Sequence, residues 1–345
     1  MFVLDVSALY YTIVILAFIL IVFEGFSRIA FRKHFRTEPN QSFFPWIFLV
    51  LMLLFMVPCL MSLFDLGSFT LAISAAILLS VVCAIPSFTS ALSRQHQEFL
   101  IREGAIGMVL LALAFLIADI MALIVSQGIR TLSDAFLLLL QHVLVGVGIG
   151  VIFGIVIFDR MRHRKANLLV HLALLCTAIL AYIVAEELGG NGIIAVAAFG
   201  VFFMNTSISE TAELHHLSTK LQVLLEGLAL ALALLFLYQY YTLVTWMFAL
   251  KALAAFAVAI IIRLFALALA REISFGSVRD RKEALRWILL MPKGKEVLIA
   301  GLAVGALNLG ASSAVAMLVL FVIALSYLVG SLVVHAEQIR TWFSK

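Results

Sequence analysis

The side chain best suited to chemistry in this sequence is Asp119, the one carboxylate in the apolar run from Phe115 to Met121. An ionisable group at the middle of a membrane costs about 3 kcal/mol on insertion scales, so its presence needs a reason. The helical rise places Asp119 about 22 Å beyond Gly104, where its apolar segment begins. A carboxylate at this depth can take up and release a proton or a cation. The alternative is a hydrogen bond between helices that serves packing alone.

Two basic residues, Lys251 and Arg263, lie inside another long apolar segment. A basic residue near a helix end usually extends its side chain to the lipid headgroups, and Arg263 is only about 10 Å from the end of its segment. The functional interpretation is a fixed positive charge that compensates a buried acid when no cation is bound. We keep both interpretations for Arg263 and favour the functional one for Lys251.

Two apolar segments are interrupted where oxygen ligands become available. Pro86 removes a backbone donor and frees a carbonyl group in the first of them. The hydroxyl residues that follow it are Ser87, Thr89 and Ser90. The interruption of the second segment consists of Pro292, Gly294, Lys295 and Glu296. Broken helices in corresponding halves of a chain indicate the mid-membrane site of a transporter, although a proline can also simply open a helix.

An acidic pair, Glu186 and Glu187, follows a further apolar segment. Because the pair lies at a predicted outer boundary, it is either solvated or guards an outer entrance. Signatures of enzymes are missing from the sequence, including the HExxH zinc motif and the glycine-rich phosphate loop. The longest polar stretch runs only from about residue 271 to residue 286. We therefore expect neither an enzyme nor a cofactor, and no metal other than a transported cation.

Membrane-spanning helices must position these residues. Hydrophobic residues make up 65% of the 345 positions and charged residues only 12%, about half the charged fraction of a soluble domain. Lipid is therefore the solvent of most of the surface. With about 20 apolar residues needed per crossing, we expect eleven spans. They lie at Val6–Ser27, Phe43–Phe64, Phe69–Leu92, Gly104–Ser126, Phe136–Phe158, Asn167–Ala185, Gly192–Thr206, Leu221–Tyr238, Thr242–Ala270, Leu285–Leu307 and Ser313–His335.

The distribution of Lys and Arg between the loops predicts the orientation. Basic residues cluster after the first, third, fifth and ninth spans and again at the C-terminus, and the loops between these carry few of them. Since Lys and Arg collect on the cytoplasmic side, the N-terminus is predicted outside and the C-terminus in the cytoplasm. The same clusters account for the net charge of +4, so we expect lipid and not nucleic acid as the partner.

Six segments, in the right order, make the chain resemble the monovalent cation/proton antiporter superfamily, which includes sodium/proton and potassium/proton exchangers. The resemblance extends from about residue 20 to the C-terminus. The segments are Ile21–Gly25, similar to the "LFEGG" helix end; Ala75–Leu92, similar to the first crossing helix; Leu111–Ile124, similar to the helix with the essential aspartate, matched by Asp119; Glu187–Gly200, similar to the "G-x-S-G-I-L-A-A-F-x-x-G" helix; Ile260–Leu264, similar to the helix with the buried basic residue; and Met291–Ala300, similar to the start of the second crossing helix.

This resemblance implies an all-α polytopic membrane protein with an inverted-repeat antiporter fold and two broken crossing helices. Residues 69–126 would hold the first crossing helix and the Asp119 helix, and residues 242–309 the basic helix and the second crossing helix. A single transporter-like domain would cover residues 1–345. The resemblance also implies a homodimer, which we expect in the cytoplasmic membrane of a prokaryote.

The chain departs from the family pattern at several positions. Ala84-Ile85 stands where members commonly have Thr-Asp, and Ala118-Asp119 stands where they have Asn-Asp or Asp-Asp. Ala114 replaces an acid that often lies five residues before the aspartate. Members also usually have two helices before the "LFEGG" helix, and this chain begins too late to contain them, so a partner membrane chain is a candidate source.

Two functions are compatible with these features. The first, implied by the resemblance, is a cation/proton antiporter in which Na⁺ or K⁺ and H⁺ compete for Asp119. Oxygen atoms of Ser87, Thr89 and Ser90 would complete the site, with Arg263 or Lys251 compensating its charge when it is empty. The second is a transport-inactive relative that serves as a structural or regulatory subunit of a membrane complex. The sequence favours the first, because Asp119 would be costly to keep without a use.

Overall fold

The computed structural model describes residues 6–26, 44–64, 69–82, 108–117, 119–120, 123–124, 132–161, 168–204, 227–273, 295–306 and 312–343. Every secondary-structure element within these stretches is a helix. The labelled α-helices are α1 (Val6–Phe26), α3 (Phe44–Phe64), α4 (Phe69–Val82), α6 (Leu132–Met161), α7 (Leu168–Glu187), α8 (Gly192–Met204), α10 (Trp246–Ile273), α12 (Lys295–Ala306) and α13 (Ser312–Phe343). Two shorter helices occupy Met108–Ile117 and Gly227–Gln239, and η4 (Tyr241–Leu243) is a single 3-10 turn.

Each of the eleven expected spans coincides with one of these helices, which confirms the all-α prediction for the described part of the chain. Several boundaries differ from the prediction; α6, for example, begins at Leu132 and not at Phe136, and it ends at Met161 and not at Phe158. Helix α10 begins at Trp246 and not at Thr242, because the Thr245 hydroxyl accepts a hydrogen bond from the Phe248 N–H at 3.2 Å and caps the helix there. Helix α13 continues to Phe343, past the expected end at His335.

The chain is an integral membrane protein. Three described helical segments are long and apolar enough to cross a membrane, namely Ile47–Phe64, Ser133–Arg160 and Trp246–Ala266. The other apolar helices are shorter within the described residues, so their status as complete spans stays a prediction. The N-out orientation and the inverted repeat also stay predictions.

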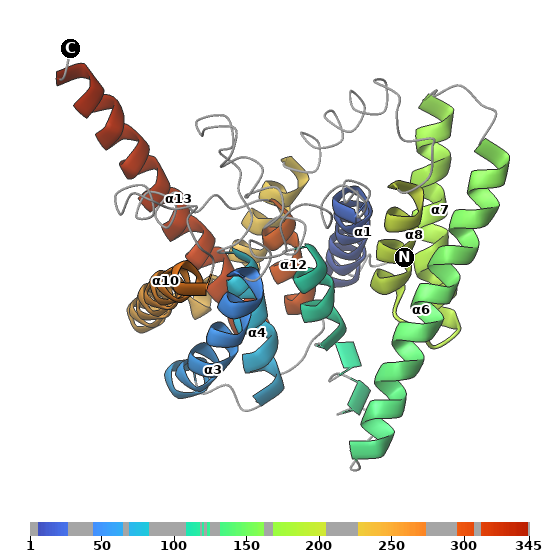
Figure 1. Cartoon of the computed structure of the whole chain (residues 1–345), viewed down its shortest axis with the longest axis horizontal. Coiled ribbons are helices and arrows are strands. Elements are labelled where there is room, and N and C mark those ends of the chain that lie inside the picture. Colours follow the sequence, from blue (N-terminus) through green and yellow to red (C-terminus); the bar gives the residue numbers. More distant parts are fainter. Residues whose placement is uncertain are drawn as a thin grey trace.

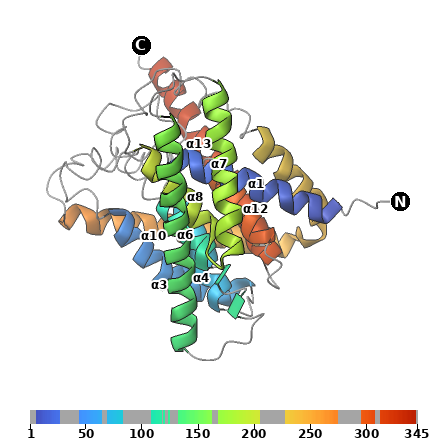
Figure 2. The same cartoon turned by 90° about the vertical axis from the view of Figure 1, so that its right-hand side faces the viewer.

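Two groups of helices flank α1. Helices α6, α7 and α8 pack against one another and form the green side of Figure 1. Helices α3, α4, α10, α12 and α13 form the second group. Helix α1 packs on α7 and α8 on one side and on α12 on the other, so it joins the two groups. Figure 2, turned by 90°, brings α6 and α7 to the front as two roughly parallel helices.

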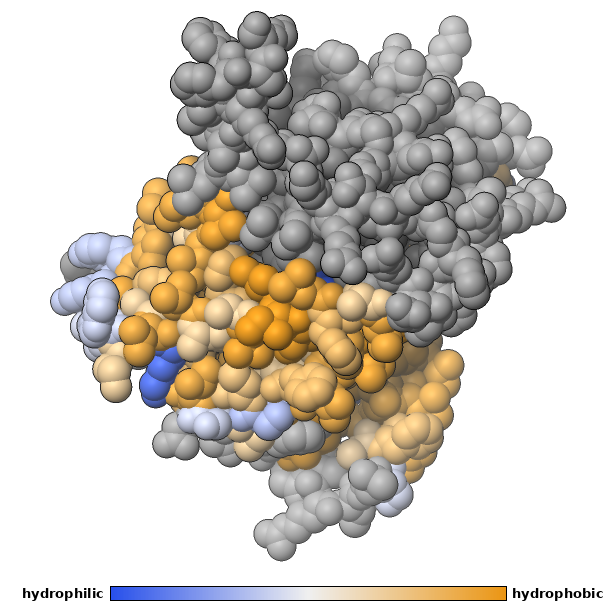
Figure 3. All heavy atoms as spheres, turned by 60° about the vertical axis from the view of Figure 1, so that its left-hand side comes forward, coloured by the Kyte–Doolittle hydropathy of each residue, from blue (hydrophilic) through white to orange (hydrophobic). Residues whose placement is uncertain are grey.

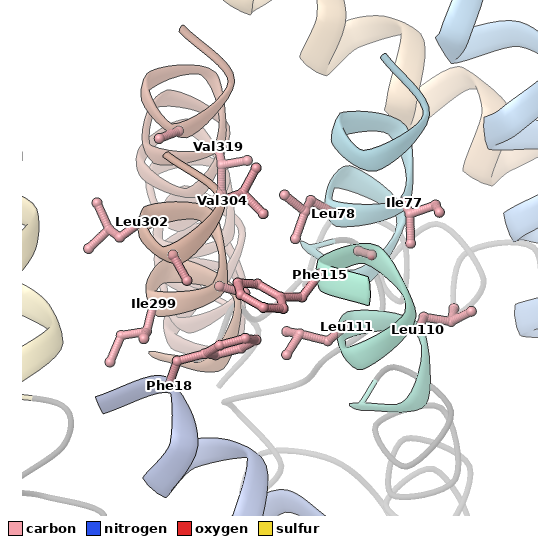
Figure 4. Packing of buried hydrophobic residues seen from close by; sticks show 14 of the residues in the cluster. Phe18, Ile77, Leu78, Leu110, Leu111, Phe115, Ile299, Leu302, Val304 and Val319 are labelled. Carbon is pink, nitrogen blue, oxygen red and sulfur yellow. The ribbon is translucent and has the colours of Figure 1, made fainter. Parts of the chain in front are cut away.

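The helix that leads to Asp119 is held by a fully apolar contact region between the two groups. Phe115 packs against Phe18 of α1 with ring centroids 5.0 Å apart. Figure 4 shows these two rings together with Leu111, facing Ile299 of α12 on one side and Leu78 of α4 on the other. All five side chains are at most 3% exposed. Close packing of this kind limits how far the helix can shift, so it fixes the depth of Asp119 in the bundle.

The outer surface is apolar, as a lipid-facing surface must be. Figure 3 shows that most of the coloured surface on the side of α10 is orange, the colour of hydrophobic residues. Large apolar side chains are exposed along α3 at Val50, Leu54 and Phe55 and along α10 at Ile261 and Phe265. In water, contiguous apolar surface of this extent would be an unusual feature, whereas in a bilayer it needs no further cover.

Candidate ion-binding site

The candidate site is built around the turn between α7 and α8. Gly189 adopts a φ of +72°, in the left-handed region that favours glycine. The Gly190 N–H donates to the Ala185 carbonyl at 2.8 Å, and the Gly189 N–H donates to the Glu186 carbonyl at 3.0 Å. These two bonds are the Schellman pattern that ends a helix. Helix α7 therefore stops at Glu187, and α8 begins at Gly192 after only the four residues 188–191.

Asn191 caps the N-terminus of α8. Its Oδ1 atom accepts a hydrogen bond from the Ile194 N–H at 3.0 Å, and its backbone carbonyl accepts the first helical bond, from Ala195, at 3.2 Å. This is the usual geometry of an asparagine N-cap. The cap occupies the oxygen of the side-chain amide, so the NH₂ group points away from the helix.

The NH₂ group of Asn191 donates to Asp119. The distance between Asn191 Nδ2 and Asp119 Oδ2 is 2.9 Å. Asn191 is 0% exposed, and Asp119 is half-buried. The site thus holds a carboxylate inside the helix bundle whose hydrogen-bond donor is a neutral amide, so the bond leaves the negative charge in place.

A second carboxylate lies at the same helix end. Glu186 Oε1 accepts a hydrogen bond from the Gly192 N–H, the first amide of α8, at 2.7 Å. The amides at the start of a helix carry a partial positive charge, which stabilises carboxylates placed there. Glu186 is otherwise exposed on the last turn of α7, and it interacts electrostatically with Asp119. The two acids therefore belong to one site.

Helix α6 packs against the turn between α7 and α8. A Cβ atom on Gly146 would lie 2.7 Å from the Asn191 carbonyl oxygen, so only glycine allows α6 this close to the turn. Gly150, one turn further, lies against the Ala195 carbonyl oxygen in the same way. Small residues at four-residue spacing allow close contact between helices in membranes. The backbone N–H of Asn191 donates to the His142 carbonyl of α6 at 3.1 Å, which fixes the register of the two helices.

His142 and Tyr182 complete the polar surroundings of Asp119. His142 Nδ1 lies 2.8 Å from the Leu138 carbonyl oxygen. Because a carbonyl can only accept, this ring nitrogen carries a hydrogen. Both side chains lie near Asp119. The Tyr182 ring also lies directly against Gly192, so it covers the start of α8.

The structure brings two of the predicted site residues together, Asp119 and Glu186. Glu187, the last residue of α7, is exposed, and its role at an outer entrance stays a prediction. The hydroxyl residues Ser87, Thr89 and Ser90 lie outside the described residues, as do Pro292 and Gly294. Lys295 and Glu296 are the first two residues of α12, and their side chains are not among those described.

The two basic residues of the prediction lie on α10. Arg263 is 4% exposed, and its guanidinium carbon lies 5.5 Å from the centre of the Phe48 ring of α3. This geometry is a cation–π contact between α10 and α3 inside the bundle. Lys251 is half-buried in the second turn of α10. Charge compensation of Asp119 by either residue stays a prediction.

Sequence reasoning did not identify Asn191, His142 and Tyr182 as site residues. A signal existed for Asn191, since asparagine between glycines and before an apolar run is typical of a helix N-cap. His142 and Tyr182 are polar residues inside apolar helices, and this pattern does not reveal which residues of other helices they contact. Among the described residues, no group of three or more His, Cys, Asp or Glu is arranged to hold a metal ion.

Comparison with known proteins gives one kind of match. No family model matches the sequence, and no curated protein does. Among solved structures, that of the sodium proton antiporter MjNhaP1 from Methanocaldococcus jannaschii at pH 8 matches with a TM-score of 0.66 and 14% sequence identity. The match covers 94% of this chain and 86% of that one. This chain has an antiporter-like fold. At this identity the likeness concerns the fold alone, and the ions that the chain transports are a separate question.

Proposed function

We propose that this chain is a secondary active antiporter that exchanges Na⁺ or K⁺ for H⁺ at Asp119. The observation that carries the proposal is the hydrogen bond from Asn191 to Asp119, which holds a carboxylate inside the bundle through a neutral donor. Such a carboxylate can take a proton or a cation, and occupancy by one excludes the other. Exchange then follows from competition for a single group, within a fold that resembles that of a sodium proton antiporter.

The remaining parts of the proposed mechanism extend the sequence predictions. A hard monovalent cation needs several oxygen ligands, and Ser87, Thr89 and Ser90 together with carbonyls near Pro86 are the proposed additional ones. Arg263 or Lys251 stabilises the site when it is empty. Two structural repeats then move relative to each other around the site, so that it faces each side of the membrane in turn. We also propose that the chain acts as a homodimer.

The experiment that tests this function measures how cations dissipate a preset pH gradient in proteoliposomes. Na⁺, K⁺ and Li⁺ are added in turn to vesicles containing the wild type, Asp119→Asn or Asp134→Asn. Asp134 is an exposed aspartate in the first turn of α6, so its variant controls for the substitution itself. We expect the wild type and Asp134→Asn to dissipate the gradient and Asp119→Asn to be inactive. Equal activity of both variants would overturn the assignment of Asp119.

A transport-inactive subunit is the second candidate, and one observation favours it. Ala114, at the position where related antiporters often have an acid, is 0% exposed and packs within the apolar core. The site therefore has one fewer carboxylate than the family pattern implies. If folded wild type in proteoliposomes dissipates no gradient with any of the three cations, the subunit function is the better one. A partner membrane chain should then copurify with the protein from its native membrane.

A further inference from the structure

The orientation of the Asn191 side chain follows from an obligatory donor. The Ile194 N–H can only donate, so the side-chain atom that faces it at 3.0 Å must be the amide oxygen. The NH₂ group must then face Asp119. Rotating the amide by 180° would place NH₂ against the N–H and the oxygen against the carboxylate, which replaces two attractive contacts with two repulsive ones.

The backbone of Asn191 holds this side chain in place. Its N–H donates to the His142 carbonyl of α6 at 3.1 Å, and its carbonyl accepts from Ala195 at 3.2 Å. The residue is also 0% exposed. Asn191 therefore cannot turn its NH₂ group away from Asp119 without giving up the cap of α8.

This arrangement makes the two oxygens of Asp119 inequivalent. Oδ2 accepts from an amide NH₂ group at 2.9 Å, and such a group neither coordinates a cation nor accepts a proton. We propose that Asn191 is a positioning residue that reserves Oδ2 as a hydrogen-bond acceptor and leaves Oδ1 as the atom that takes the proton or the cation. The cation is then bound by one oxygen of Asp119 and not by both. This inference rests on the proposed antiporter function.

The test separates the hydrogen bond that Asn191 donates to Asp119 from the capping of α8 by the same residue. Asn191→Ser keeps a good N-cap residue but lacks an NH₂ group that reaches Asp119, and Asn191→Asp keeps both the shape and the cap. Thr245→Ala is the matched control, because Thr245 caps α10 with the same bond to the third amide of the helix and lies on a different helix from Asp119, Glu186 and Asn191. Apparent KM for the cation and maximal rate are measured in proteoliposomes over a range of pH, with the thermal stability of each variant.

We expect Asn191→Ser to keep wild-type thermal stability while the apparent KM rises about tenfold or more, since a hydrogen bond to a charged group is worth that factor in an equilibrium constant. Asn191→Asp places a second buried carboxylate oxygen against Asp119, so its thermal stability should fall as the pH rises. The pH dependence of the rate should shift together with the apparent KM, whereas Thr245→Ala should keep the wild-type KM and pH profile. A wild-type KM and pH profile in Asn191→Ser would overturn the inference and leave the antiporter function intact. Absence of exchange in the wild type would overturn both.

Infrared spectroscopy gives a readout that does not depend on transport. The carbonyl stretch of protonated Asp119 is identified by its loss in Asp119→Asn. If the proton is on Oδ1 and Oδ2 accepts from Asn191, this band should move to higher frequency in Asn191→Ser, because the carbonyl loses its hydrogen bond. An unchanged band would show that Asn191 does not hold Oδ2, which overturns the inference even if the serine variant transports poorly.

Discussion

Gly146 of α6 lies directly against the backbone of Asn191, so that a Cβ atom on the glycine would come within 2.7 Å of the Asn191 carbonyl oxygen. The carbonyl belongs to the residue that holds Asp119. A glycine on one helix therefore sets the position of the carboxylate on another, through the turn between α7 and α8.

Gly146→Ala should displace the α7–α8 turn and impair transport. The added methyl group meets a backbone carbonyl, which cannot rotate away, and overpacking of this kind costs about 1–3 kcal/mol. Gly148→Ala is the matched control, because a Cβ atom there has nothing within 4 Å and the residue is exposed on the same helix. We expect a lower melting temperature and a lower rate in proteoliposomes for the first variant only. Equal behaviour of the two would show that α6 can move away without disturbing Asp119.

Glu186→Gln should weaken cation uptake, and Glu187→Gln should not. Glutamine can still accept the bond from the Gly192 N–H, so the variant removes the negative charge near Asp119 and little else. Glu186 lies at the surface, yet desolvation raises the pKa of its carboxyl group to about 7, so its charge is complete only above that pH. We expect there a rise of about threefold to tenfold in apparent KM. Glu187 is its exposed neighbour in the same turn. The KM is measured from cation titrations, and an effect of equal size in both variants would indicate a general surface potential.

Gly189→Ala should destabilise the turn between the two helices. A φ of +72° is strained for any residue with a Cβ atom, and we expect a loss of about 1–2 kcal/mol in the free energy of unfolding. Gly189→Asn is the comparison, since asparagine tolerates the left-handed region better than alanine. Reversible unfolding in detergent gives both values. If alanine proves no worse than asparagine, backbone strain is not what selects glycine at this position.

Arg263→Gln should reduce transport more than Lys251→Gln does. Arg263 is almost fully buried and contacts Phe48, whereas Lys251 is half-buried near the start of α10. Removing a buried charge disturbs the internal charge balance that we propose for the empty site, and an effect of about tenfold or more on the rate is expected. Arg263→Lys keeps the charge but loses the flat contact with the ring, so this variant should retain more of the transport rate than Arg263→Gln. A fully active Arg263→Gln would assign this residue to packing.

The sequence by itself determined that the chain is an all-α membrane protein, and it singled out Asp119 as the most costly acid in an apolar segment. Apolar runs long enough for a bilayer require helices, because a buried backbone must satisfy its own hydrogen bonds, and this reasoning located all eleven helices. Asp119 was identified for a similar reason, since the cost of a carboxylate in an apolar helix depends on its local sequence alone. The start of α10 after Thr245 was missed, because Thr242 and Thr245 are both good N-cap residues and the apolar run does not distinguish between them.

Only the tertiary structure decided what surrounds that acid. Asn191 is 72 positions away from Asp119 in the chain, and no periodicity in the sequence relates the two. Glu186 was predicted at an outer boundary, either solvated or guarding an entrance, and only the turn at Gly189 brings the start of α8, which Asn191 caps, beside it. Pairings of this kind arise from how helices pack, which depends on shape and close contact between distant segments. The length and polarity of each helix, in contrast, are local properties, and for that reason the sequence revealed them.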